Sequence, residues 1–286
     1  MSAKNCPICI KKMNPGKQVW HFVCPGCHYE MAILTPSINQ TNLHQPLDES
    51  ARETGLRTIR DTNFKKLLSR IGTFKSGHKK LLDVGCAHGW FLDMAKNQFD
   101  VLGIEPDQVI FDQTAKTGIS IRLGYFPEVL NSEEKFDIII FNDVIEHIPN
   151  IQSVLNSCYQ YLNKNGLLVL NLPNSKGIFY LLSKLFCTIG IKGFFERMWQ
   201  VGMPSPHVHY FNQKNLTSLL QNQSFTVKEK GRLDTLSLSG LFTRLTYSDK
   251  KINLFKIIPM YCLISLSLPL LKLMPSDITY IIAEKN

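Results

Sequence analysis

The sequence shows little that would direct the chain to a membrane: we expect neither an amino-terminal signal peptide nor a membrane-spanning helix. Its first residues are polar and lead directly to Cys6. Residues 257–271 carry no charge, but this stretch has only 15 residues and contains Pro259 and Pro269. A spanning helix needs about 20 apolar residues. We therefore expect a cytoplasmic protein without a transmembrane helix.

The sequence also lacks an arginine-rich or aromatic-interleaved basic stripe, although its formal net charge is +9. Much of this excess comes from lysines that are dispersed along the chain. A basic balance is compatible with nucleic acid, anionic lipid or acidic glycans, and it does not choose among them. The absence of a concentrated stripe argues against a nucleic-acid partner.

The eight cysteines do not indicate a disulfide framework. Cys86, Cys158, Cys187 and Cys262 are scattered through apolar segments, where cysteine usually behaves as a small buried hydrophobic residue. This usage is typical of a cytosolic protein. With 286 residues and 44% hydrophobic content, the chain is long enough for one main domain and a small appendage.

The other four cysteines predict a metal site within residues 1–35. They form two Cys-Pro-x-Cys pairs, Cys6 with Cys9 and Cys24 with Cys27, and 14 residues separate the pairs. Each pair directs two sulfurs at one centre, and two pairs complete a tetrahedral thiolate site. Zinc is favoured on availability, although a rubredoxin-type iron site has the same ligands. We expect a structural zinc ribbon; the alternative is a surface that recognises a substrate or partner.

Residues 81–105 have the pattern of a nucleotide half-site. An apolar run over residues 81–84 is typical of a buried parallel strand, and a turn of small residues follows it. Apolar residues at helical spacing come next, and a second strand over residues 101–104 ends at Glu105. In a doubly wound sheet, such a turn and the helix amino terminus face the ligand, and the acid accepts hydrogen bonds from the ribose hydroxyls.

The turn departs from a dinucleotide fingerprint, because Trp90 stands where the third glycine of Gly-x-Gly-x-x-Gly is expected. The small residues instead fall as Gly85-x-Ala87-x-Gly89. Asp83 supplies a carboxylate that would repel pyrophosphate but can pair with the ammonium group of a methionine moiety. With these features the sequence resembles the class I S-adenosylmethionine (SAM)-dependent methyltransferases. Their first motif is hydrophobic-hydrophobic-Asp-x-Gly-x-Gly-x-Gly, so Ala87 requires a slightly roomier turn.

The segment after the predicted fourth strand, residues 136–141, extends this resemblance. It runs Asn142-Asp143-Val144-Ile145-Glu146-His147 and resembles the motif of a branch that includes quinone, small-molecule and polysaccharide-cluster methyltransferases. The resemblance implies that Glu146 and His147 face the acceptor, and that the cofactor lies along several strand ends. The implied cofactor contacts are Asp83, Gly85, Cys86, Ala87, Gly89, Glu105, Pro106, Gly124, Tyr125, Asn142, Asp143 and Val144.

His147 is the candidate catalytic base for an acceptor oxygen, with Asp143 behind it. The alternative is that His147 only fixes the loop through a hydrogen bond, and the sequence does not distinguish the two roles. The sulfonium methyl is already activated, so the main task of the protein is to align the acceptor and exclude water.

The resemblance implies an α/β fold with a Rossmann-like, doubly wound, seven-stranded sheet whose last strand, residues 278–283, is antiparallel. We expect a zinc ribbon in residues 1–35, a linker and covering helix in 36–78, and a SAM-dependent methyltransferase domain in 79–286. Insertions on the acceptor side of that domain are expected in residues 175–212 and, as a helical apolar segment before the last strand, in 232–276.

The two insertions leave alternatives open. His207-Val208-His209 suggests metal binding, but no carboxylate lies nearby in the sequence, so we expect these histidines to pack and hydrogen-bond locally. Residues 257–271 are expected to cover the acceptor site. The alternative is peripheral contact with an anionic membrane, helped by neighbouring lysines at positions Lys250, Lys251, Lys256 and Lys272.

The first functional hypothesis is methyl transfer from SAM to a hydroxyl of a sugar, a polysaccharide precursor or a related small molecule. The ribbon, the EHIPN motif and the HVHYF segment together resemble methyltransferases encoded with surface-polysaccharide genes. The second is an RNA methyltransferase that uses the ribbon to recognise RNA, although the Asn/Asp-Pro-Pro-aromatic motif of amino-group methylation is missing. The third is a SAM-binding protein at a membrane surface without turnover. The sequence does not identify the acceptor or the oligomeric state.

Overall fold

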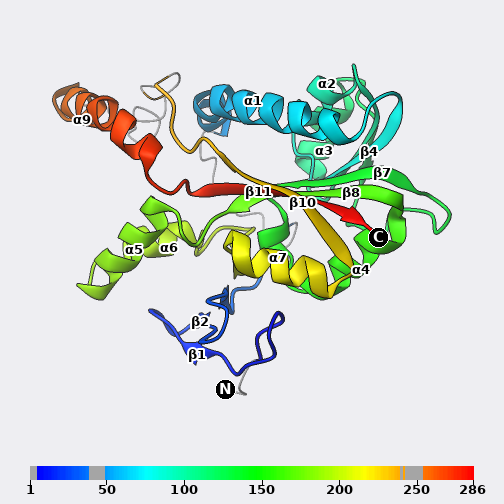
Figure 1. Ribbon diagram of the computed structural model, residues 1–286. Helices are drawn as coiled ribbons and strands as arrows, with labels where there is room; N and C mark the ends of the chain where they lie inside the picture. Colours follow the sequence, from blue (N-terminus) through cyan, green and yellow to red (C-terminus); the bar gives the residue numbers. More distant parts are fainter. Residues whose placement is uncertain (1–4, 39–48, 239–240, 242–253) are drawn as a thin grey trace.

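A seven-stranded sheet forms the centre of the structure, which is a computed structural model (Figure 1). The described residues are 5–38, 49–238, 241 and 254–286. Most of the predicted linker, and the part of the second insertion that holds Lys250 and Lys251, lie outside them.

The order of the strands in the central sheet is β10-β11-β8-β7-β4-β5-β6. The strands are β4 (Lys79–Val84), β5 (Phe99–Glu105), β6 (Ile121–Leu123), β7 (Phe136–Asn142), β8 (Leu162–Pro173), β10 (Phe225–Leu233) and β11 (Ile278–Lys285).

The strand directions confirm the predicted doubly wound α/β fold. Strands β6, β5, β4, β7 and β8 are parallel, whereas β11 pairs antiparallel with both β8 and β10. The carboxyl ends of the parallel strands therefore meet at one edge of the sheet. Ligands of open α/β sheets bind at that edge.

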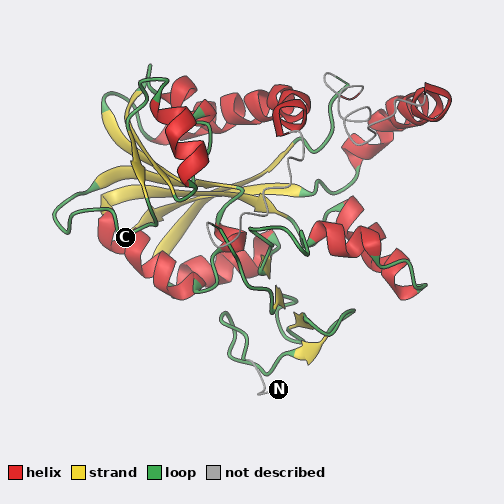
Figure 2. Cartoon of the chain, turned by 180° about the vertical axis from the view of Figure 1, so that it is seen from behind, coloured by secondary structure: helices red, strands yellow, loops and turns green. Residues whose placement is uncertain are grey.

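Helices cover both faces of the sheet, as Figures 1 and 2 show from opposite sides. One face carries α1 (Glu49–Phe74), α2 (Trp90–Ala95) and α3 (Gln108–Ala115), and the other carries α4 (Ile151–Tyr161) and α7 (Gln213–Asn222). Successive strand residues point to opposite faces, so the apolar strands supply two cores. Ile138 and Ile140 pack with α1 and α2, whereas Ile139 and Phe141 pack with α4 and α7.

Two predicted boundaries differ from the structure. The sequence predicts a turn at Asn165-Gly166 before a strand, but β8 begins at Leu162 and runs through it. Its pairing with β7 shifts from Phe136↔Leu162 to Ile138↔Leu167, so the extra residues bulge from the sheet and Asn165 takes a positive φ of 62°. The sequence also predicts that Pro149 starts a helix, but α4 begins at Ile151, because the Asn150 side chain caps it by accepting from the Ser153 N–H.

The cysteine-containing segment forms a small sheet that is completed by a distant part of the chain. Strands β1 (Asn14–Pro15), β2 (His21–Val23) and β3 (Glu30–Ala32) are joined by β9 (His209–Tyr210), which comes from the first insertion. Cys6, Cys24 and Tyr29 are buried in the same core as α4 and α7. The segment is therefore packed into the main body of the protein through both its sheet and its core.

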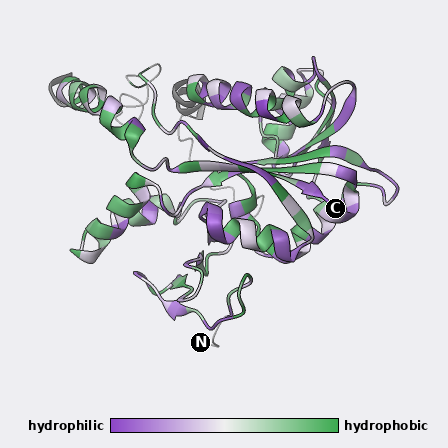
Figure 3. Cartoon of the chain, in the orientation of Figure 1, coloured by the Kyte–Doolittle hydropathy of each residue, from purple (hydrophilic) through white to green (hydrophobic). Residues whose placement is uncertain are grey.

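The insertions form helices on one side of the molecule. These are α5 (Ile178–Thr188), α6 (Gly193–Met198) and α9 (Leu254–Leu273), and the hydropathy colouring shows apolar residues along them (Figure 3). Helix α9 confirms the prediction that residues 257–271 are helical. One row of leucines on this helix is exposed. Cys262 is exposed as well, so the expectation that it is buried was wrong. Within the described ranges, no helix has the length and apolar character required to cross a membrane. The exposed leucines are Leu263, Leu266, Leu270 and Leu273.

Candidate functional site

The turn between β4 and α2 brings the backbone to the carboxyl edge of the sheet. Gly85 and Gly89 both have a φ of 70°, and Ala87 has a φ of 44°. A Cβ atom on Gly85 would lie 2.7 Å from Cγ2 of Val144, so this position requires glycine for both its conformation and its space. Ala87 takes the left-handed conformation despite its side chain. The turn therefore presents backbone, with little side-chain bulk, to a ligand.

Glu105 ends β5 beside this turn and holds it in place. One carboxylate oxygen accepts from the Ala87 N–H at 2.8 Å, and the other accepts from the Asp107 N–H at 2.9 Å. Burial raises the pKa of Glu105, and the two N–H donors oppose that rise. Asp107 in turn caps α3 by accepting from Val109 and Ile110. Glu105 thus holds the turn after β4 and the segment after β5 beside each other at the carboxyl edge of the sheet.

Asp83 and Asn142 end the two central strands, next to each other. The Asn142 Nδ2 donates to Oδ1 of Asp83 at 3.3 Å, and Asp83 is only 1% exposed. Burial raises the Asp83 pKa to about 8, although the hydrogen bond from Asn142 opposes the rise. No cation of the described residues pairs with Asp83. A buried carboxylate of this kind is suited to binding a positively charged ligand group.

The remaining predicted cofactor residues lie around this edge. Cys86 and Pro106 follow the ends of β4 and β5, and the Gly124 N–H donates to the Glu105 carbonyl at 3.0 Å. Tyr125 follows Gly124 and is 48% exposed, so its ring is accessible from solvent. The Val144 side chain packs over Gly85. The structure thus brings the ends of β4, β5, β6 and β7 together around the turn.

The loop after β7 carries the acceptor-side candidates. Asp143 has a φ of 54°, and its N–H donates to the Asn171 carbonyl of β8 at 2.9 Å. His147 donates from Nδ1 to the Pro206 carbonyl at 3.0 Å, and burial lowers its pKa. We expected Asp143 behind His147, but the carboxylate beside Nε2 of His147 belongs to Glu146, at 3.9 Å. Burial raises the pKa of Glu146 well above its usual value.

The two histidines of the first insertion have different surroundings. His209 packs locally as predicted, because Nδ1 bonds the Tyr29 hydroxyl and Nε2 donates to the Ile148 carbonyl at 2.9 Å. His207 also packs and hydrogen-bonds locally, because its Nε2 accepts from the Gln200 amide at 2.9 Å and its ring packs on Tyr210. The structure adds a carboxylate that is not near in the sequence, since Nε2 of His207 lies 4.0 Å from Oε1 of Glu146. That carboxylate is 61 residues earlier in the sequence, and folding alone brings the two together. Burial lowers the His207 pKa to about 3.

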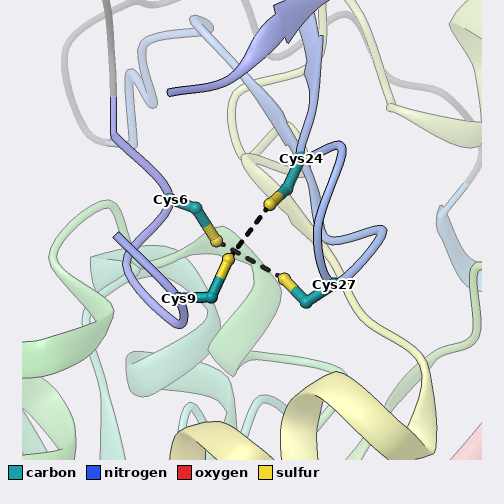
Figure 4. A group of neighbouring side chains, drawn as sticks. All are labelled: Cys6, Cys9, Cys24 and Cys27. Carbon is teal, nitrogen blue, oxygen red and sulfur yellow. Dashed lines mark hydrogen bonds between the residues drawn. The ribbon is translucent and has the colours of Figure 1, made fainter. Parts of the chain in front are cut away.

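The four ribbon cysteines converge on one centre (Figure 4). The Sγ atoms of Cys6 and Cys27 are 3.5 Å apart, those of Cys9 and Cys24 are 3.3 Å apart, and all four lie within 4.8 Å of one another. Tetrahedral zinc with Zn–S bonds of about 2.3 Å requires sulfurs about 3.8 Å apart. The donor set and spacing therefore fit a tetrahedral thiolate-bound ion.

Comparison with known proteins gives one consistent family. A family model described as a methyltransferase domain matches residues 56–230, more than half of the chain. The ubiquinone biosynthesis O-methyltransferase of Rattus norvegicus is 25% identical over 166 residues, which cover 51% of this chain and 48% of that protein. The Photorhabdus laumondii enzyme of the same name is 32% identical over 121 residues, 39% of this chain and 49% of that protein. The chain thus spans about half the length of these relatives.

Solved structures share the fold. A SAM-dependent methyltransferase from Archaeoglobus fulgidus superimposes with a TM-score of 0.52 and 17% identity, covering 83% of this chain and 99% of that one. The cyclopropane synthase MmaA2 from Mycobacterium tuberculosis gives a TM-score of 0.56 and 14% identity, covering 88% of this chain and 90% of that one.

Proposed function

The chain belongs to the class I SAM-dependent methyltransferases, and we propose that it methylates a hydroxyl oxygen of a sugar, a polysaccharide precursor or a related small molecule. SAM is its cofactor. The observation that carries the proposal is the pair of buried carboxylates, Asp83 and Glu105, on adjacent strand ends beside the glycine-containing turn. An oxygen acceptor is supported by the curated relatives, which are named O-methyltransferases.

Each predicted cofactor residue has a role in this proposal. Glu105 accepts hydrogen bonds from the ribose hydroxyls, and Asp83 pairs with the ammonium group of the methionine moiety. Asn142 supports Asp83 through its existing hydrogen bond. Tyr125 is exposed at the edge of the site and stacks on the adenine. The main-chain atoms of Gly85, Cys86, Ala87 and Gly89 line the space between these groups, and Pro106, Gly124, Asp143 and Val144 border it.

The acceptor lies on the side of His147 in this proposal. The bound cofactor supplies an activated methyl group. His147 keeps its hydrogen on Nδ1, because Pro206 accepts there, and so presents a free Nε2 lone pair. That nitrogen is placed to take up the hydroxyl proton of the acceptor, while bound SAM would give its methyl group to the acceptor oxygen and be left as the neutral thioether. The lowered pKa of His147 keeps its imidazole neutral and ready to accept.

The ribbon is proposed to hold zinc and to act structurally. Its four sulfurs fit the ion, and a segment this short gains much of its folding energy from metal binding.

To identify the acceptor, the full chain is incubated with tritiated SAM and separated fractions of glycans, lipids, RNA and small metabolites. Label in the glycan or small-metabolite fraction is the expected result. Label in RNA alone would replace the proposal by the RNA methyltransferase hypothesis.

Replacing His147 separates its chemical role from a structural one. His147→Ala is expected to lower the methylation rate by about 100-fold or more, within the range for loss of a general base, and to leave SAM affinity within about twofold. Labelled-methyl transfer and calorimetric SAM binding measure the two effects. The exposed His78→Ala is the matched control and should change neither. Equal losses of turnover and SAM affinity would mean that His147 only maintains the loop.

The pH dependence of SAM binding tests the role of Asp83. Its pKa of about 8 means that Asp83 is largely protonated in the free protein at neutral pH, whereas the ammonium group requires the ionised form. Affinity should therefore rise with pH by up to about tenfold per unit and level off above the pKa. Calorimetry from pH 6 to 8.5, in buffers of different ionisation enthalpy, should also show proton release. Affinity that is constant over this range would exclude the ionisation of Asp83 from the binding step.

A further inference from the structure

We propose that Glu146, His147 and His207 form a second metal site, which binds a divalent transition-metal ion beside the acceptor. The cluster is distinct from the four cysteines. Glu146 and His147 lie in the 3-10 turn η1 (Ile145–His147) after β7, and His207 comes from the first insertion. One ligand atom from each residue lies within 4.8 Å of the other two. The inference rests on the proposed function, because it adds an ion to that same acceptor site.

Glu146 supplies the first argument. Its side chain is 1% exposed, and neither carboxylate oxygen has a hydrogen-bond partner among the described residues. Its backbone is held in place, since its carbonyl accepts from the Val208 N–H at 2.8 Å. A buried carboxylate without donors is costly unless a cation or a proton neutralises it. The only groups that approach Oε1 as ion-pair partners in the described structure are the two histidines, at 3.9 and 4.0 Å.

The histidines supply the second argument, because each has an unprotonated Nε2 close to Oε1 of Glu146, at 3.9 Å for His147 and 4.0 Å for His207. The Pro206 carbonyl fixes the hydrogen of His147 on Nδ1, which leaves the Nε2 lone pair free. In metal-binding histidines, the ring nitrogen that does not bind the metal usually donates a hydrogen bond of this kind. Gln200 donates from its amide to Nε2 of His207 at 2.9 Å, so that nitrogen is unprotonated and its lone pair is engaged by Gln200. In the proposed site, the ion takes the place of the Gln200 amide at Nε2 of His207.

The spacing and composition of the cluster suit a transition metal. Tetrahedral bonds of about 2.1 Å place ligand atoms about 3.4 Å apart, so the two measured distances need to shorten by about 0.5 Å. Two imidazoles and one carboxylate are the ligand set of catalytic zinc and non-haem iron sites, which keep positions open for substrate. His147 has 15% of its side chain exposed, so solvent reaches one residue of the cluster, whereas Glu146 and His207 are 1% and 7% exposed.

The ion changes how the acceptor is activated. A hydroxyl that contacts a divalent ion has a lowered pKa and releases its proton to solvent. Its oxygen then bonds to the methyl carbon as the sulfur–carbon bond breaks, and the neutral thioether departs. His147 acts as a ligand in this form and not as the base. If the site binds no ion, His147 remains the base, so the proposed function and the metal inference fail separately.

The test is manganese binding to the full chain after its cysteine site has been loaded with zinc. Manganese prefers oxygen and nitrogen ligands over thiolates, so it reports the second cluster. The electron paramagnetic resonance signal of free manganese should fall until one ion is bound per chain. His207→Gln and Glu146→Gln should each weaken this binding by more than about tenfold, a loss seen even when only a supporting residue is changed. The exposed His78→Gln is the control and should bind as the unchanged protein does.

Two readouts keep the test decisive. Each variant must retain its zinc and its circular-dichroism spectrum, so that lost manganese binding is not lost folding. Binding of no manganese by the unchanged protein, or equal binding by His207→Gln, would overturn the inference. If His207→Gln binds no manganese but still transfers methyl groups at the full rate, the proposed methyltransferase function stands and only the role of the ion is rejected.

Discussion

Glu105→Gln is expected to weaken SAM binding by about 100-fold or more. The carboxylate accepts one backbone N–H on each oxygen, from Ala87 and Asp107, and the ribose hydroxyls need the same group. Glutamine has a single acceptor oxygen, and its amide nitrogen would face an N–H donor. Hydrogen bonds to charged groups contribute about 1.5–3 kcal/mol each, and about 1.4 kcal/mol corresponds to a tenfold change in affinity. Isothermal titration calorimetry with SAM measures the loss.

Asp100→Asn is the matched control for this change. Asp100 lies on the same strand, β5, near its other end, and it is exposed. The substitution removes the same charge without touching the turn, so SAM affinity should stay within about twofold. If both variants bind SAM equally well, Glu105 does not contact the ribose. If both lose binding alike, the effect comes from net charge and not from the geometry of the site.

Cys24→Ser is expected to release the ribbon metal and to loosen the acceptor side of the protein. Metal binding supplies about 10–16 kcal/mol in small zinc domains, so loss of one ligand should unfold the ribbon. That unfolding removes the partner of β9 and the Tyr29 hydroxyl that bonds His209. His209 in turn donates to the Ile148 carbonyl, directly after η1 (Ile145–His147). Hydrogen exchange of residues 145–148 and 207–211 should accelerate strongly, alongside loss of zinc.

Cys262→Ser provides the control, because Cys262 is exposed on α9 and belongs to neither candidate metal site. It should keep its zinc and the slow exchange of both segments. If Cys24→Ser loses its zinc while residues 145–148 exchange as slowly as before, the ribbon does not support the acceptor loop. Its metal would then serve only the ribbon itself.

The arrangement of the strand, turn and second strand at residues 81–105 was predictable because these residues are close in sequence. Residues 81–105 contain a complete strand, turn, helix and strand, and local periodicity is enough to recognise them. The apolar runs of β4, β7 and β8 likewise identify buried parallel strands, since both of their faces are covered. The antiparallel last strand followed from the family resemblance, and the structure confirms it.

The cluster of Glu146, His147 and His207 was not predictable, because it is built from segments that only the fold brings together. Glu146 meets His207 across 61 residues, so a search for a nearby carboxylate in the sequence misses the contact. Strand β9 has two residues and carries no periodic signal, yet it completes the ribbon sheet. The exposure of Cys262 was also missed, because an apolar run does not reveal which of its faces packs.

The central claim is that the two buried carboxylates form a SAM site. Equilibrium dialysis of the folded, zinc-loaded chain against tritiated SAM tests it most directly. We predict saturable retention of one SAM per chain, which an excess of unlabelled demethylated cofactor displaces and which needs about 100-fold more SAM in Glu105→Gln. No retention of label by the folded chain at millimolar SAM would contradict the account.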